Sequence, residues 1–162
     1  MSLPHDRSRL LVDDGFPTEI FSHSIDRWIE TMLADDVSEE GGSNNLVRAK
    51  LIVKEKGVIC GQFVINRLLD KHAPNCSYDW KISEGELVKE KEQILQISGI
   101  SSEILKIERV MLNLLGRLSG ISTTTSEWVS GSNDLQLACT SCLLYTSPSP
   151  RDLFTSRMPS SA

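Results

Sequence analysis

The chain has 162 residues, of which 40% are hydrophobic and 24% charged, and its formal net charge is −5 at pH 7. This length suffices for one ordinary domain, or for one small domain and part of another, with enough apolar content for a buried core. The acidic balance argues against a nucleic-acid surface, and no run approaches the roughly 18 apolar residues that a membrane span needs. The charged N-terminus lacks the apolar middle region of a secretory signal, so we expect a cytoplasmic protein.

The four cysteines are interpreted as free thiols, because a protein without a secretory signal is expected in a reducing compartment. They are Cys60, Cys76, Cys139 and Cys142. We expect no metal site within this chain.

Residues 1–23 are predicted to form an irregular arm, since Pro4, Gly15 and Pro17 lie among charges without a sustained period. From Ser24 onward, apolar residues recur at the i, i+3, i+4, i+7 spacing of an amphipathic helix. The pattern predicts a helix with Ser24 as its N-cap and its end near Asp35.

Residues 46–65 first alternate between apolar and polar and then run apolar. Val47, Ala49, Leu51 and Val53 share one face of the alternating part. This pattern predicts a β-hairpin with its turn at KEKG, residues 54–57.

The sequence FVINRLLDKHAP predicts a short helix that stops before Pro74, because the residue before a proline is pushed out of helical dihedral angles. Two short strands are predicted within residues 76–83 and 92–100. The charged stretch between them, residues 83–92, is predicted to form a turn and a charged edge.

A long helix is predicted from Ser101 to Gly120 or somewhat beyond. Its apolar residues cover roughly 220° of the circumference, so we expect burial on most sides. These residues are Ile104, Leu105, Ile107, Val110, Met111, Leu112, Leu114, Leu115 and Leu118. The remaining edge carries Lys106, Arg109, Asn113 and Arg117.

A cation beside a buried helix either pairs with a carboxylate of the same protein or binds an anionic ligand. Both interpretations remain open, and structural pairing is the commoner one. Asn113 lies four residues from both Arg109 and Arg117, and no acidic residue occupies the neighbouring positions on this edge. Because the planar guanidinium suits bidentate binding of carboxylate or phosphate, the composition favours a small anion.

The last stretch, residues 142–162, has neither a helical nor a strand period and is rich in serine and proline. It resembles the conceptual translation of a transposon-type sequencing adapter, with a natural disordered tail as the alternative. We leave it out of the fold prediction and expect the authentic polypeptide to stop near Thr140.

The block ERVMLNLLGRLSGIST, residues 108–123, resembles the pattern E-R-x-x-L-N-x-L-x-x-L-S-G-I-A-T of quinolinate phosphoribosyltransferases, the carboxylating nicotinate-nucleotide pyrophosphorylases. Ten specified positions match, and Ser122 replaces the alanine. KEKGVICG, residues 54–61, resembles the E-x-x-G-V-x-x-G hairpin of the family. Residues 80–99 resemble its following strand pattern, and LACT, residues 137–140, resembles the strand that leads into T-R-K-T.

The resemblance implies an α+β fold. Residues 24–118 would form the open-faced α/β sandwich of the N-terminal domain, and residues 119–141 would begin a truncated α/β barrel. It also implies a homodimer or a higher homo-oligomer, in which the N-terminal domain of one subunit lies over the barrel of its partner. Neither a nucleic acid nor a membrane is an expected partner.

The implied enzyme is a pentosyltransferase, a class of glycosyltransferase. It joins quinolinate to phosphoribosyl pyrophosphate with Mg2+ and forms nicotinate mononucleotide, carbon dioxide and pyrophosphate in NAD biosynthesis. Arg109 would bind a quinolinate carboxylate in the partner's active site, and Thr140 would lie among substrate-contacting residues. Asn113 and Arg117 are expected to support the helix through hydrogen bonds. No catalytic or metal-binding residue is expected within this chain, which we predict to be inactive by itself.

Two departures from the family pattern affect the prediction. The loop DDVSEEGGSNN, residues 35–45, replaces the usual G-D-x-T, and Glu90 stands where a glycine is expected. Three alternatives remain: the relative of the family found in molybdenum-transport operons, a non-catalytic biotin- or lipoyl-like binding module, which residues 82–99 suggest weakly, and a structural interaction domain with a buried helix.

Overall fold

The computed structural model describes residues 12–13, 16–36 and 43–131. Contacts divide the chain into two units, residues 1–127 and 128–162, and of the second unit only the end of one helix, residues 128–131, is described. The first unit combines helices with antiparallel sheets, which confirms the predicted α+β class. The predictions for Thr140 and for the tail, residues 142–162, lie outside the described residues.

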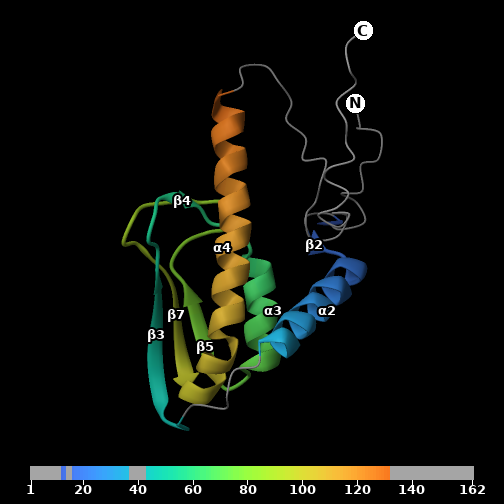
Figure 1. Ribbon diagram of the computed structural model, residues 1–162, viewed down its shortest axis with the longest axis vertical. Helices are drawn as coiled ribbons and strands as arrows, with labels where there is room; N and C mark the ends of the chain where they lie inside the picture. The colour runs from blue at the N-terminus through green and yellow to red at the C-terminus, as the bar shows by residue number, and fades with distance from the viewer. Residues whose placement is uncertain (1–11, 14–15, 37–42, 132–162) are drawn as a thin grey trace. The chain divides into compact units, whose positions relative to one another are not determined.

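The main sheet has three antiparallel strands in the order β3-β7-β5, which span Leu46–Ile52, Gln93–Ile100 and Ser77–Trp80 (Figure 1). The central strand β7 pairs with β3 from Leu46↔Ile100 onward and with β5 from Ser77↔Ser98 onward. Because β7 has a neighbour on both sides, it is the most buried of the three strands.

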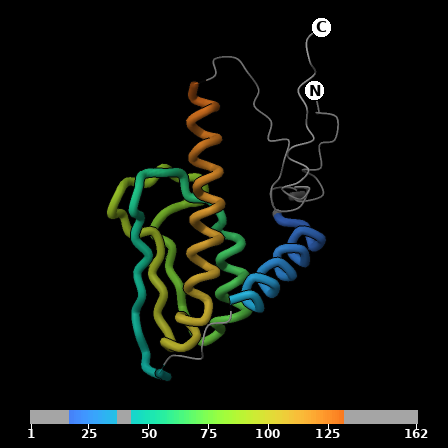
Figure 2. The backbone as a smooth tube through the Cα atoms, in the orientation of Figure 1, coloured from blue at the N-terminus to red at the C-terminus, as the bar shows by residue number. Residues whose placement is uncertain are grey.

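Two further pairs of strands are very short. β1 (Val12–Asp13) pairs with β2 (Phe16–Pro17), and β4 (Gly57–Val58) pairs with β6 (Leu87–Val88). The described helices are α2 (Glu19–Asp35), α3 (Gln62–His72) and α4 (Ser101–Gly131). Figure 2 traces the end of α2 to a position alongside the first turns of α4.

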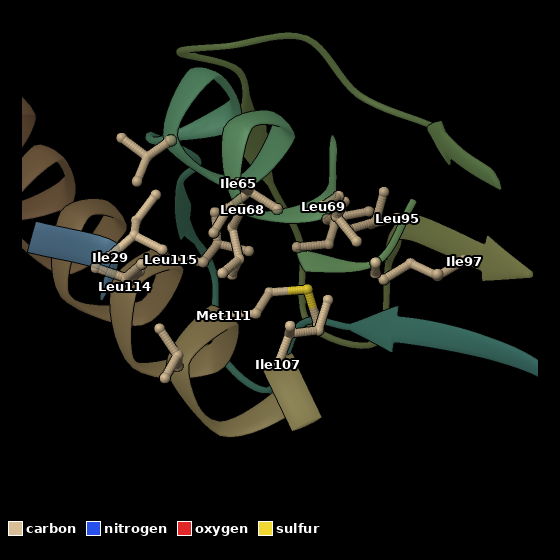
Figure 3. Close-up of a cluster of buried hydrophobic side chains, with 14 of the residues drawn as sticks. Ile29, Ile65, Leu68, Leu69, Leu95, Ile97, Ile107, Met111, Leu114 and Leu115 are labelled. Carbon is tan, nitrogen blue, oxygen red and sulfur yellow. The ribbon is translucent and has the colours of Figure 1, made fainter. Parts of the chain in front are cut away.

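The core lies between one face of the main sheet and the three helices (Figure 3). Ile29 comes from α2, Leu68 from α3, Leu95 from β7 and Leu114 from α4, and each is at most 1% exposed. On β3, Arg48 and Lys50 alternate with the inward-facing residues and are exposed, as expected for an open-faced sandwich.

The structure confirms the short helix before Pro74 as α3, the two predicted strands as β5 and β7, and the start of the long helix at Ser101. α4 continues without a break past residue 119, where the barrel was predicted to begin. Within the predicted charged edge, the strand β6 was missed.

The predicted start of the first helix at Ser24 was wrong. The N-cap is Thr18, whose hydroxyl accepts the Phe21 N–H at 3.2 Å, so α2 occupies part of the predicted irregular arm. The additional turn brings the Phe21 ring onto the Phe63 ring of α3, with centroids 6.0 Å apart. This tertiary contact was not visible in the local pattern.

The predicted hairpin within residues 46–65 was also wrong. β3 pairs with β7, and β4 pairs with β6. The inward-facing residues Ala49 and Leu51 of β3 pack against the core beside the buried strand β7, and a two-residue strand such as β4 offers no comparable surface.

The expectation that the long helix is buried on most sides was wrong as well. Leu105 and Leu112 are 46% and 42% exposed, although Ile107 and Leu114 are at most 1% exposed. The sheet and the other two helices cover only one side of α4. Its apolar arc is therefore wider than the surface that the described residues bury.

Candidate functional site

Arg109 lies on α4 between Ile107 and Val110 in the sequence. Those two residues are buried, whereas the Arg109 side chain is 78% exposed. Its Nη1 donates a hydrogen bond to Oδ1 of Asp36 at 3.1 Å. Asp36 is the C-cap residue of α2, and its side chain is only 10% exposed. The structure thus brings an acid from another helix to the basic edge of α4.

Sequence reasoning missed Asp36 because it considered only the neighbours of Arg109 on the same helix. The one available signal was the position of Asp36 immediately after the predicted end of α2. An ion pair with so exposed a partner contributes about 0–1 kcal/mol. A guanidinium has five N–H donors, so a single contact leaves the Arg109 side chain able to bind an anion.

Asn113 and Arg117 lie further along the same edge and are exposed. Neither side chain makes a hydrogen bond or ion pair with any residue that the structure describes. The predicted hydrogen bonds that support the helix are therefore not found in this part of the chain. Burial of the opposite side of α4 holds the helix instead.

Two hydroxyls near the end of the ERVMLNLLGRLSGIST block form the hydrogen bonds that sequence reasoning did not predict. Thr123 Oγ1 accepts the Val58 N–H at 2.9 Å, and Ser119 Oγ accepts the Cys60 N–H at 3.1 Å. They attach the segment 57–61 to α4.

Two glycines permit this close approach. A Cβ on Gly57 would lie 2.8 Å from Thr123 Oγ1, and one on Gly61 would lie 2.7 Å from a methyl carbon of Leu118. Gly61 also has φ +113°, a conformation that favours glycine. The glycines of KEKGVICG thus follow from the packing of this segment against α4.

Glu84 caps the start of α3. Its two carboxylate oxygens accept the N–H groups of Gly61 and Gln62 at 2.7 and 2.8 Å. Burial, together with the nearby Glu84 carboxylate, raises the pKa of Cys60 to about 11. Because a thiol with so high a pKa is not ionised near neutral pH, Cys60 is unsuited to act as a nucleophile.

A charged cluster joins α2 to α3. The buried Asp26 accepts hydrogen bonds from Arg67 Nε at 2.7 Å and Arg67 Nη2 at 2.6 Å, and Lys71 Nζ lies 2.6 Å from Asp26 Oδ2. The Arg67 hydrogen bonds are the main reason that the pKa of Asp26 is lowered to about 2. The guanidinium carbon of Arg67 also lies 5.7 Å from the centroid of the Phe63 ring. The cluster fixes the helix that carries Asp36.

Among the described residues, no group of three or more His, Cys, Asp or Glu side chains is placed to hold a metal ion. Cys60 and Cys76 are free thiols in this part of the chain. None of the helices in the described ranges is both long and apolar enough to cross a membrane.

A groove of about 270 Å³ lies between β3 and α4. Its lining includes the exposed Leu105 and Leu112 and the charged Lys50 and Glu108. Arg109 is not part of its lining, so the groove and the basic edge are separate features of α4.

Residues 29–119, more than half of the chain, match the family described as quinolinate phosphoribosyl transferase, N-terminal domain. The probable carboxylating nicotinate-nucleotide pyrophosphorylase of Synechocystis is 32% identical over 111 residues, which are 65% of this chain and 38% of that protein. The chloroplastic nicotinate-nucleotide pyrophosphorylase of Arabidopsis thaliana is 28% identical over 105 residues, which are 60% of this chain and 30% of that protein.

Solved structures of nicotinate-nucleotide pyrophosphorylases also resemble this chain. The nicotinate-nucleotide pyrophosphorylase of Francisella tularensis aligns with a TM-score of 0.63 and 26% identity over 67% of this chain and 40% of its own. NadC of Streptococcus pyogenes aligns with a TM-score of 0.64 and 26% identity over 70% of this chain and 45% of its own. The chain therefore spans less than half the length of these relatives. The matched range includes residues 82–99, so the comparisons do not support the carrier-module alternative.

Proposed function

We propose that this chain, which belongs to the quinolinate phosphoribosyltransferase family through its N-terminal domain, is part of an enzyme that forms nicotinate mononucleotide from quinolinate and phosphoribosyl pyrophosphate. The reaction would release pyrophosphate and carbon dioxide in NAD biosynthesis. The names of the relatives support this activity, and the length of the match assigns the chain to less than half of the enzyme.

Within that enzyme, Arg109 would bind a carboxylate of quinolinate. The observation that carries this role is an exposed guanidinium on a helix whose opposite side is buried in the core, with one contact of 3.1 Å to the described residues. A packed helix holds the cation in place before the substrate arrives, which reduces the entropy lost on binding. The planar group matches a carboxylate in two-point geometry.

The other parts of the site would come from outside the described residues. We propose that the enzyme is a homodimer or larger homo-oligomer in which Arg109 reaches the barrel of the partner subunit. Thr140 would contact substrate, and Mg2+ would bind in the remainder of the enzyme. A cytoplasmic location remains a prediction, and some plant relatives are named chloroplastic or mitochondrial.

The role of Arg109 is tested by its replacement with alanine in the full-length enzyme that contains this domain. We expect kcat/KM for quinolinate to fall by an amount equivalent to about 2–4 kcal/mol, because a desolvated carboxylate loses its charged partner. Arg109→Lys keeps the charge but loses the planar fork, so it should give an intermediate value.

Arg117→Ala provides a matched control, since Arg117 lies two turns further along the same exposed edge. It should change kcat/KM for quinolinate much less than Arg109→Ala does. Steady-state kinetics with each substrate varied in turn measures both variants. Unchanged kinetics in Arg109→Ala would remove the proposed role of this residue.

A further inference from the structure

The contact between Arg109 and Asp36 is unequal in burial. The Asp36 side chain is 10% exposed, whereas the Arg109 side chain is 78% exposed. A carboxylate that is largely removed from water needs a hydrogen-bond donor, and Nη1 of Arg109 supplies one at 3.1 Å. The acid is therefore the fixed member of the pair, and the guanidinium is the member that meets solvent.

The backbone around Asp36 is held in three ways. The Asp36 N–H donates to the carbonyl of Met32 at 3.1 Å, which closes the last turn of α2. The Asp26 cluster ties α2 to α3, and the stacked rings of Phe21 and Phe63 tie the start of α2 to the same helix. Asp36 is thus a firm point of attachment beside α4.

We propose that Asp36 is a positioning residue for Arg109. It would hold one edge of the guanidinium, so that the remaining N–H donors face the solvent side and are oriented for a dicarboxylate ligand. This inference rests on the proposed function of Arg109 and assigns a task to a residue that no sequence motif indicated.

The geometry indicates whether Asp36 supports the Arg109 guanidinium or competes with a substrate carboxylate for it. A competing acid would occupy the guanidinium in two-point fashion and would have to leave before a substrate carboxylate could bind. Asp36 makes a single contact, which leaves most donors of Arg109 available. Removal of a support should weaken quinolinate binding, whereas removal of a competitor should strengthen it.

The first test uses the 162-residue chain. We expect Asp36→Asn to lower the order parameter of the Arg109 Nε–H group in an NMR relaxation experiment, because the charge that holds the guanidinium is lost. Asp35→Asn removes an equal charge from the adjacent, exposed residue and serves as the matched control. An Arg109 side chain with the same order parameter in all three proteins would overturn the inference.

The second test uses the full-length enzyme that contains this domain. We expect Asp36→Asn to raise KM for quinolinate about three- to fivefold, the upper end of what an ion pair with so exposed a partner can contribute. KM for phosphoribosyl pyrophosphate should stay unchanged. Asp36→Ala, which lacks any acceptor, should have a larger effect than Asp36→Asn, and Asp35→Asn should have none.

The double variant separates positioning from a general structural role. If Asp36 acts through Arg109, adding Asp36→Asn to Arg109→Ala should not raise KM for quinolinate further. An equal increase of KM for quinolinate in the unmodified and Arg109→Ala backgrounds would overturn the inference. An unchanged or lowered KM when Asp36→Asn is introduced alone would also overturn it. If Arg109→Ala alone leaves quinolinate kinetics unchanged, the proposed function of Arg109 has failed, whatever Asp36 does.

Discussion

At the scale of single residues, the buried Asp26 is paired with two cations, Arg67 and Lys71. Its pKa is lowered from 3.8 to about 2, mainly by hydrogen bonds from Arg67. A carboxyl with a lowered pKa stabilises the fold above its unfolded pKa, and this stability is lost as the pH falls through the folded pKa. The contribution of Asp26 is therefore complete near neutral pH and declines between about pH 4 and pH 2.

We predict that Asp26→Asn lowers the free energy of unfolding by about 2–3 kcal/mol at pH 7, because Arg67 and Lys71 lose the negative charge that they share and one of its two acceptor oxygens. At pH 2 the difference from the unmodified chain should be smaller, since Asp26 is then partly protonated. Urea unfolding at the two pH values measures both quantities, with the exposed Asp35→Asn as control. A difference that does not vary with pH would contradict this explanation.

His72 should produce a pH dependence in a different range. Its Nε2 is buried without a hydrogen-bond partner among the described residues, and its pKa is lowered from 6.5, first by burial and then by Lys106. Lys71 also lowers this pKa, whereas the Glu30 and Asp26 carboxylates of α2 oppose the shift. Because the unfolded chain binds the proton more readily, the fold should lose stability as the pH falls below about 6.5.

We predict that His72→Gln reduces the loss of stability between pH 7 and pH 5. Urea unfolding at both pH values gives the comparison, and His23→Gln at an exposed position of α2 is the matched control. If His72→Gln keeps the whole pH dependence of the unmodified chain, the buried imidazole is not its source.

At the scale of elements, local patterns predicted α3, β5, β7 and the start of α4 because each has a strong apolar period or a clear boundary residue. They failed where distant contacts decide the outcome. Thr18 rather than Ser24 caps α2, and β3 pairs with a strand 41 or more positions away in sequence. Phe63, which packs against the start of α2, lies outside the window that predicted that helix, and β7 lies outside the window that predicted the pairing of β3.

The attachment of residues 57–61 to α4 gives a prediction at the same scale. Thr123→Val keeps the side-chain shape but leaves the Val58 N–H without its acceptor, so we expect a loss of about 1–3 kcal/mol in the free energy of unfolding. Hydrogen exchange at the Val58 amide should also accelerate.

Thr124→Val is a close control for Thr123→Val. Both hydroxyls donate to the carbonyl four residues earlier in α4, at 2.7 Å for Thr123 and 3.0 Å for Thr124. Only the Thr123 hydroxyl also accepts a hydrogen bond from β4. Equal losses of stability in the two variants would show that this link between β4 and α4 contributes nothing.

At the scale of the whole molecule, the family motif indicated Arg109, which the structure shows as an exposed cation on a packed helix and whose role in binding stays a prediction. It could not indicate Asp36, which reaches Arg109 across 73 positions of sequence. The hydrogen bonds expected of Asn113 and Arg117 are instead made by Ser119 and Thr123, whose hydroxyls were visible in the motif but gave no sign of their partners.

The chain spans only 38% of its Synechocystis relative, so the proposed site would be completed by other parts of the enzyme. We propose that Arg109 acts in the active site of a partner subunit. The most direct measurement mixes full-length Arg109→Ala subunits with subunits inactivated in the barrel. Random exchange should form hybrid dimers with one intact site and recover about a quarter of the unmodified activity. Samples that contain only one type of variant subunit should recover no activity after the same exchange. If the mixture also recovers no activity, Arg109 does not act in the active site of a partner subunit.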